Sequence, residues 1–253
     1  MTRIVIHGAG GAMGRAVAEL AAADPQVEIV AGVDVNTGIN CPFPVFSSLA
    51  EYGGEADAVV DFSTAKAVDD LLRTCVERRL PLVLCTTGLS EEQLTAVREA
   101  SGQIPILRSG NMSLGINLLL KVVEEVAGVL LQADFDPEIV EMHHRRKLDA
   151  PSGTALMLAE AVNRAVNGTY EVCPDRHERR MSRPKQEIGV SAVRGGTIVG
   201  EHNVIFAGPD ERIEIRHIAY SRSVFANGAL QAAKSLAGKE PGLYDMASVL
   251  NRF

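Results

Sequence analysis

A run of five side chains that can carry positive charge, His143 to Lys147, lies near the middle of this 253-residue chain. The run is out of character, because 32 Asp and Glu outnumber 25 Lys and Arg overall. It is followed by Asp149-Ala-Pro-Ser-Gly-Thr154 and an apolar segment, a pattern that predicts the start of a helix. The N–H groups and the dipole of a helix start attract anions. Together, the run and the helix start predict a receptor for a small polyanion such as a dicarboxylate.

Within this run, His143 and Lys147 are the candidates for proton transfer. A histidine and a lysine in one cationic pocket lower each other's pKa, which brings both groups nearer the range useful for proton transfer. A solvated basic loop is the simpler interpretation, because most charge runs are solvated. Adjacent histidines also suggest a metal site, but neighbours on a strand point to opposite faces and no Asp, Glu or Cys completes a familiar ligand spacing. We therefore expect no metal.

A glycine-rich segment, Gly8-Ala-Gly-Gly-Ala-Met-Gly14, lies between a predicted strand and a predicted helix. In that place glycine lets the backbone approach a pyrophosphate, and the helix N-terminus supplies N–H donors. The spacing departs from G-x-G-x-x-G because Met13 holds the third glycine position. A glycine turn of purely steric origin is the alternative.

Asp34 strengthens the prediction of a dinucleotide site. It lies 20 residues after Gly14, at the end of the second predicted strand, where such cofactors present their ribose hydroxyls. Val35 follows it, so no adjacent basic side chain awaits a 2′-phosphate, and Asp34 itself would repel one. Arg15 at the helix start is the group that could offset this repulsion. We expect NADH to be used at least as well as NADPH.

Two smaller features lie at predicted strand ends. Cys85-Thr86-Thr87-Gly88 follows an apolar run, and its hydroxyls either contact a nicotinamide ribose or cap the next helix. His7 directly precedes the glycine-rich segment, and we expect it to pack or cap there instead of acting in catalysis.

Short β-branched runs and longer segments of helical period alternate through the first half of the chain. The predicted strands are 4–6, 27–33, 58–62, 82–85 and 104–107, and the predicted helices are 12–23, 65–79 and 91–101. Parallel crossovers of this kind predict an α/β fold with a Rossmann-like, doubly wound parallel sheet.

The pattern changes after Ser113. Helices are predicted over 114–131 and from near Ser152, with strands at 138–142, 188–193, 203–207 and 212–219 that look antiparallel. The polar segment 167–186 is interpreted as a surface loop, and the Ala-rich helix 224–236 is expected to return to the first domain. We therefore expect residues 1–113 with 222–253 to form a dinucleotide-binding domain, and 114–221 a second, α+β domain that binds the substrate.

Composition excludes several classes of protein. The chain is 46% apolar and 23% charged, as in soluble globular proteins, and its mild acidity argues against nucleic-acid binding. It has no run of about twenty apolar residues, the length that spans a bilayer, so we expect no membrane partner and a cytoplasmic location. The scattered cysteines, Cys41, Cys75, Cys85 and Cys173, are expected to be reduced.

The segment Glu141-Met-His-His-Arg-Arg-Lys-Leu-Asp-Ala-Pro-Ser-Gly-Thr-Ala155 resembles a signature of the dihydrodipicolinate reductase (4-hydroxy-tetrahydrodipicolinate reductase) family, E-x-H-H-x-x-K-x-D-A-P-S-G-T-A. The likeness covers essentially the whole chain. Its other segments are 8–15, 85–88, 109–115, 199–202, 221–222, 225–228 and 242–246. The family pattern has glycine where this chain has Cys85.

The resemblance implies reduction of 4-hydroxy-tetrahydrodipicolinate to tetrahydrodipicolinate with NADH or NADPH, in the diaminopimelate route to lysine. It implies that His143 is the acid/base residue and that Lys147 donates the proton. Substrate carboxylates would be held by His144, Gly153 and Thr154. Cofactor contacts would come from Gly8, Ala9, Gly10, Gly11, Ala12, Met13, Asp34, Cys85, Thr86, Thr87, Ser109, Gly110, Asn111 and Met112. A homotetramer formed through the sheet of the second domain is implied as well.

Two other functions fit parts of the sequence. Another two-domain nicotinamide dehydrogenase, acting on aspartate or homoserine, would use the glycine-rich segment and Asp34 equally, and the segment 143–154 separates it from the first reading. A nucleotide-sensing protein without turnover would bind NADH and leave it unoxidised. Intact His143 and Lys147 argue against that function, because function resides in sites and not in folds.

Overall fold

A computed structural model describes residues 1–177 and 179–251 of the chain. By their contacts, the residues separate into two compact units, Met1–Leu114 with Arg222–Phe253, and Gly115–Ser221. Within the described residues, no helix combines the length and the apolar character needed to cross a membrane.

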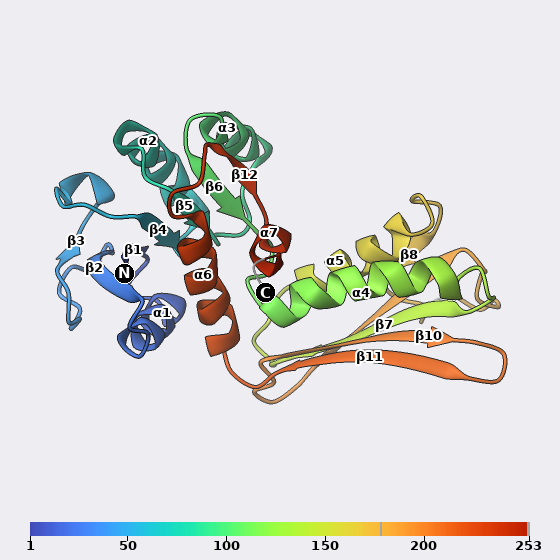
Figure 1. The fold of residues 1–253 in the computed structure, drawn as a ribbon. Helices are drawn as coiled ribbons and strands as arrows, with labels where there is room; N and C mark the ends of the chain where they lie inside the picture. Colours follow the sequence, from blue (N-terminus) through green and yellow to red (C-terminus); the bar gives the residue numbers. More distant parts are fainter. Residues whose placement is uncertain (178, 252–253) are drawn as a thin grey trace. The chain divides into compact units, whose positions relative to one another are not determined.

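The first unit is built on a seven-stranded sheet in the order β12-β6-β5-β4-β1-β2-β3, and all its neighbouring strands pair in parallel (Figure 1). The strands are β1 Thr2–His7, β2 Val27–Val33, β3 Val45–Phe46, β4 Ala58–Asp61, β5 Leu82–Leu84, β6 Pro105–Arg108 and β12 Gly242–Tyr244. Six of them follow the Rossmann order, which confirms the predicted doubly wound fold. The order reverses between β1 and β4, the place where ligands of such sheets bind.

Two apolar clusters cover the two faces of this sheet. Along β1, Ile4 and Ile6 belong to one cluster and Val5 to the other, because successive side chains of a strand point to opposite faces. The helices are α1 Ala12–Ala22, α2 Val68–Arg78, α3 Glu91–Ser101, α6 Ser223–Leu236 and α7 Met246–Leu250, with short 3-10 turns at Leu49–Glu51 and Ala65–Ala67. Helix α6 packs on α1, β4 and β5, so the prediction that the last long helix returns to the first domain is confirmed.

The second unit holds a five-stranded sheet in the order β11-β10-β7-β9-β8. Its strands are β7 Asp136–His143, β8 Glu171–Cys173, β9 Glu187–Arg194, β10 Gly200–Ala207 and β11 Arg212–Ala219. The pairs β7/β10 and β10/β11 are antiparallel, but β7/β9 and β8/β9 are parallel. The expectation of antiparallel strands is therefore confirmed for β7, β10 and β11 and was wrong for β9, which runs parallel to β7. Alternating side chains show that a segment is a strand, but they carry no information on its direction.

Two helices cover one face of this second sheet, α4 Leu114–Leu130 and α5 Gly153–Arg164 (Figure 1). Their apolar side chains pack on Ile139 of β7 and on Val204 and Phe206 of β10, which are fully buried. Ser152 caps α5 by accepting a hydrogen bond from the backbone N–H of Ala155, as its type and position predict.

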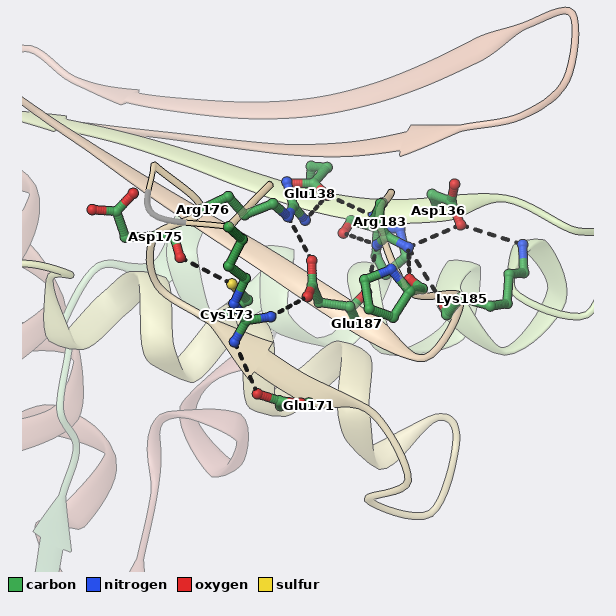
Figure 2. Close-up of polar contacts among 12 residues, drawn as sticks. Asp136, Glu138, Glu171, Cys173, Asp175, Arg176, Arg183, Lys185 and Glu187 are labelled. Carbon is green, nitrogen blue, oxygen red and sulfur yellow. Dashed lines mark hydrogen bonds and ion pairs between the residues drawn. The ribbon is translucent and has the colours of Figure 1, made fainter. Parts of the chain in front are cut away.

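The interpretation of 167–186 as a surface loop holds for most of its described residues, which are exposed and outside regular structure, but not for residues 171–173. These residues form β8, and Figure 2 shows Arg176 and Arg183 of the segment bound to carboxylates of the sheet. Arg176 binds Glu138 and Glu187, and Arg183 binds Glu138 at 2.9 Å. Glu187 is only 1% exposed. Polarity and prolines predict a loop here. The ion pairs could not be predicted, because the acidic partners of the arginines lie on β7 and β9 and no local pattern connects them.

Candidate active site

The first candidate site surrounds the glycine-rich turn between β1 and α1. Gly8 has a φ of +84°, and a Cβ at this position would lie 2.7 Å from the carbonyl oxygen of Phe62. A Cβ at Gly14 would lie 2.2 Å from the Gly8 carbonyl oxygen, so Gly14 allows the helix to approach the strand closely. Met13 instead packs its side chain against the core. Gly11, the N-cap of α1, offers no side chain to the first turn, which leaves that turn suited to a phosphate.

Asp34 and this turn line the same cavity, of about 280 Å³, at the carboxyl ends of β1, β2 and β4. Asp34 accepts hydrogen bonds from the backbone N–H groups of Gly10 at 2.8 Å and Asn36 at 3.0 Å. The other lining residues are His7, Gly8, Gly11, Val33, Val35, Ser47, Phe62, Ser63, Thr64 and Ala67. The cavity lies at the switch point of the sheet, where ligands of such folds bind, and it has an acidic ribose-binding candidate.

A buried carboxylate that the sequence analysis missed, Asp61, organises the neighbouring strand ends. It accepts a hydrogen bond from Thr86 Oγ1 at 2.6 Å and lies 2.7 Å from Nδ1 of His7. Burial raises the pKa of Asp61, but the hydrogen bonds and the charge of His7 outweigh it, and the pKa lies below its usual value. The ionised carboxylate thus holds the His7 ring at the cavity and orients Thr86.

The structure excludes one of the two alternatives for 85–88, the capping of the next helix. Ser90 caps α3, with a reciprocal bond from Gln93, so neither Thr86 nor Thr87 is the cap. Thr87 is exposed, and Cys85 packs in the core of the first unit. The thiol that replaces the family's glycine therefore lies within the core packing.

The loop after β6, from Ser109 to Met112, is held by its own hydrogen bonds. Ser109 Oγ donates to the carbonyl oxygen of Asn111 at 2.8 Å, and Asn111 Oδ1 accepts the Ser113 N–H at 2.8 Å. The Met112 carbonyl lies against Gly228 of α6, where a Cβ would come within 1.7 Å of the oxygen. The backbone of this loop is therefore fixed relative to the sheet of the first unit.

The second candidate site lies in the second unit, on the face of the sheet that the helices cover. Toward one end of this face the buried side chains are ionisable instead of apolar. Along β7, the buried positions run from Ile139 to Glu141 and His143. Strand register places His202 of β10 opposite Glu141, and Arg194 of β9 opposite His143. Three strands thus bring four ionisable side chains together.

Glu141 is fully buried and accepts four hydrogen bonds. Its Oε2 lies 2.6 Å from His143 Nδ1 and 2.7 Å from Arg194 Nη1, and its Oε1 accepts the Ser152 N–H at 3.0 Å and Arg194 Nη2 at 2.7 Å. Burial raises the pKa of Glu141, but the hydrogen bonds from Arg194, His143 and Ser152 outweigh burial and hold the pKa below its usual value. The carboxylate is ionised at neutral pH.

The pKa of His143 is lowered, mainly by burial. The hydrogen bond to Glu141 opposes the effect, and the positive charges of Lys147 and Arg194 add to it. Because Glu141 is ionised, the neutral His143 ring carries its proton on Nδ1 and keeps Nε2 as the acceptor. The His202 ring packs edge-on at 5.2 Å, and burial together with His143 lowers the pKa of His202 to about 3.

The remaining predicted residues lie on the loop after β7 and on α5. Nζ of Lys147 lies 2.9 Å from Oδ1 of Asp149, and Nδ1 of His144 is buried with no hydrogen-bond partner among the described residues. Gly153 and Thr154 form the first turn of α5, whose N–H groups point away from the helix.

The cationic run does not act as one unit. Arg145 and Arg146 are exposed, as the interpretation of a solvated loop expected, whereas His143 is buried and Lys147 is partly buried. The arginine that binds within the site is Arg194, from another strand, and His202 comes from a third. Sequence reasoning missed both residues, although His202 lies within a matching segment, 199–202, to which no role was given.

The arrangement suits an acid-base reaction on an anion. The second unit brings together a neutral histidine, a lysine ammonium group and a helix N-terminus. The first unit has a fold and a cavity of the kind that binds dinucleotides. Among the described residues, no group of three or more His, Cys, Asp or Glu side chains is placed to hold a metal ion.

Comparisons with known proteins agree with this geometry. The family model described as "Dihydrodipicolinate reductase, N-terminus" matches residues 2–112, and the model for the C-terminus matches 115–250. A 4-hydroxy-tetrahydrodipicolinate reductase of Caldanaerobacter subterraneus subsp. tengcongensis is 54% identical over 252 residues, covering 100% of this chain and 99% of the relative. The Clostridium tetani protein of that name is 46% identical, covering 99% and 98%.

A solved structure has the same fold. It is described as dipicolinate-bound dihydrodipicolinate reductase from Paenisporosarcina sp. TG-14, with a TM-score of 0.81, 24% identity and 98% coverage of both chains. Both family models and the full-length relatives lead to one conclusion. The chain belongs to the dihydrodipicolinate reductase family.

Proposed function

We propose that this chain reduces 4-hydroxy-tetrahydrodipicolinate to tetrahydrodipicolinate, in the diaminopimelate route to lysine, by the chemistry of the residues described above. The observation that carries the proposal is the joint placement of His143, Lys147 and the α5 N-terminus in one unit. The segment 143–154, which carries these groups, also distinguishes this function from that of dehydrogenases that share only the glycine-rich turn. The chain is accordingly an NAD(P)H-dependent oxidoreductase.

Residues of the first unit would hold the cofactor, which supplies a hydride when bound. The turn from Gly8 to Met13 and the start of α1 would bind the pyrophosphate, and Asp34 a ribose. The other proposed contacts are Cys85, Thr86, Thr87, Ser109, Gly110, Asn111 and Met112. Support comes from the cavity that Gly8, Gly11 and Asp34 line together. For Cys85, whose side chain is in the core, the proposed contact is through the backbone.

Residues of the second unit would hold the substrate. The N–H groups of Gly153 and Thr154 and the ring of His144 are the proposed ligands of its two carboxylates. A helix N-terminus favours negative charge by its dipole as well as by its donors. The buried Nδ1 of His144, which lacks a partner among the described residues, is consistent with a polar ligand.

Loss of the 4-hydroxyl group as water would leave a conjugated acceptor. A hydride added to that acceptor leaves carbanion character beside it, and Lys147 would donate the proton that quenches it. Asp149 pairs with the Lys147 ammonium group at 2.9 Å and so restrains its position on the loop. His143, neutral in the free protein, would act as the acid/base residue through Nε2. Burial keeps this ring uncharged at neutral pH.

NADH is proposed to serve at least as well as NADPH. Asp34 is acidic, and the Val35 side chain beside it is 99% exposed, with no charge for a 2′-phosphate. No lysine or arginine lines the described cavity.

A homotetramer is proposed, assembled through the sheet of the second unit. On the face away from α4 and α5, the apolar side chains of Val140, Met142 and Ile205 are half-buried. A cytoplasmic location, and the absence of nucleic-acid, membrane and metal partners, remain expectations from the sequence.

The test is a coupled assay that generates the substrate in situ and follows the absorbance of NADH and NADPH. Changing Lys147 to Ala should lower kcat by about 10² or more, because positioned acids contribute that much or more. Arg146→Ala is the matched control, since this neighbouring cation is exposed, and it should keep most of the activity. A wild-type kcat in Lys147→Ala, with only KM changed, would reduce Lys147 to a binding role.

A further inference from the structure

Arg194 contacts two parts of the second site. Its guanidinium forms a two-pronged pair with Glu141, with both distances 2.7 Å, and Nη2 also donates to the Asp149 carbonyl oxygen at 2.7 Å. Asp149 stands two residues beyond Lys147 on the loop after β7 and pairs with it. One side chain thus connects the carboxylate beneath His143 with the loop that carries Lys147.

The charge of Arg194 determines the net charge beside the His143 ring. A buried, ionised Glu141 alone would stabilise the imidazolium form of the ring that it binds. With Arg194 on both carboxylate oxygens, the pair is neutral overall. The other charged or titratable groups facing His143 are Lys147 on the loop and His202 on β10, and neither favours the protonated ring.

We propose that Arg194 is a positioning residue for the reaction: it neutralises the carboxylate that holds His143 and fastens the loop of Lys147 to that carboxylate. The inference rests on the proposed roles of His143 and Lys147. It adds a residue that lies outside the signature segment, on β9, and gives Glu141 the task of fixing the His143 tautomer.

The direct test follows the titration of His143 by NMR of the free protein, which needs no substrate. Arg194→Met leaves Glu141 without its counter-charge, so the His143 midpoint should rise by about one pH unit or more. Glu141→Gln should lower the midpoint, because the guanidinium then lacks its partner. The double variant removes both charges and should return the midpoint close to the wild-type value. If the two single variants shifted the His143 midpoint in the same direction, or if neither shifted it, Arg194 would not neutralise Glu141 as proposed.

The matched control is Arg216→Met. Arg216 on β11 also pairs with a carboxylate of a neighbouring strand, Glu201, and should leave the His143 midpoint unchanged. The signal of His143 among the six histidines is assigned with a His143→Gln variant.

The second part of the proposal concerns the loop. Arg194→Lys keeps the charge but cannot bind Glu141 in a two-pronged manner and Asp149 at once. In this variant the titration midpoint of His143 should therefore stay within a few tenths of a pH unit of the wild-type value. The kcat should fall about ten-fold, which corresponds to about 1.4 kcal/mol in activation free energy. A wild-type kcat would overturn the loop role. Should Arg194→Met fail to fold, Arg194→Lys and Glu141→Gln still decide both parts.

Failure of this inference and failure of the proposed function give different results. If the His143 midpoint moves as expected but the wild type does not reduce the dicarboxylate, the function is wrong and the charge pair stands. If the wild type is active and the midpoint does not move, the assignment of Arg194 is wrong.

Discussion

The hydroxyl oxygen of Ser152 lies 3.1 Å from Nε2 of His202, although the two residues are 50 positions apart in the chain. The same hydroxyl caps α5 by accepting the N–H of Ala155. The helix start proposed to bind the substrate is therefore placed by β10 as well as by its own sequence.

Ser152→Ala should affect both stability and substrate binding. Loss of the cap lowers the free energy of unfolding by about 1 kcal/mol, and the displaced helix start should raise KM for the dicarboxylate several-fold. Urea unfolding and steady-state kinetics measure the two effects. Ser90→Ala, which removes the cap of α3 in the first unit, is the matched control and should reduce stability by a similar amount without changing that KM. Equal KM effects in the two variants would contradict the account.

Thr86→Val tests the role of Asp61. The variant removes the 2.6 Å hydrogen bond to a carboxylate that is fully buried. Hydrogen bonds to charged groups contribute about 1.5–3 kcal/mol, so the free energy of unfolding should fall by that order, and KM for NADH should rise. The exposed Thr87 provides the control, Thr87→Val, which should change the free energy of unfolding little. A stability loss equal in both variants would argue against the Asp61 contact.

The free energy of unfolding should decrease as the pH is lowered below about 6.5, the ordinary histidine pKa. Because the pKa of His202 is lowered to about 3 in the folded protein, the unfolded chain binds a proton that the folded chain excludes throughout this range. The contribution is complete above the unfolded pKa and is lost as pH falls, at about 1.4 kcal/mol per pH unit. His202→Gln should flatten the dependence of the unfolding free energy between pH 6 and about 4, measured by urea unfolding.

A slope in His202→Gln equal to that of the wild type would contradict the assignment of this pH dependence to His202. Asp61 and Glu141 add a further loss at lower pH. Both have lowered pKa values, so their stabilisation is present above the ordinary carboxyl pKa and disappears as pH falls through the folded value.

Cofactor preference should depend on the pair Asp34 and Val35. The wild type should show a kcat/KM for NADH at least equal to that for NADPH. Val35→Arg places a cation beside the ribose position and should raise kcat/KM for NADPH about ten-fold or more, because a hydrogen bond to a charged group contributes about 1.5–3 kcal/mol. The value for NADH should change little. Asp34→Asn should weaken NADH binding. A hundredfold NADPH preference of the wild type would contradict this reading.

Much of the fold follows from the sequence because its signals are local. Strand β2 has the predicted bounds, Val27–Val33, and so does helix α3, Glu91–Ser101, whose capping Ser90 and Gln93 lie beside it. The direction of β9 is not local, since it depends on how the chain crosses from β7. That is why the sheet of the second unit was predicted as antiparallel.

The candidate sites divide in the same way. The glycine-rich turn, Asp34, His143 and Lys147 could be found because spacing or a charge run marks them. Arg194 and His202 could not, because strand register alone brings them to Glu141. Asp61 is equally hidden, since a carboxylate at a strand end looks the same in the sequence whether it is buried or solvated.

The most direct measurement traces the hydrogen atoms. With NADH deuterated at the transferable position, and substrate generated in situ, wild-type product analysed by mass spectrometry and NMR should carry cofactor deuterium on one ring carbon. With ordinary NADH in heavy water, a neighbouring carbon should take up solvent deuterium instead, the proton delivered by Lys147. Oxidation of NADH that leaves no cofactor deuterium in the dicarboxylate ring would contradict the account.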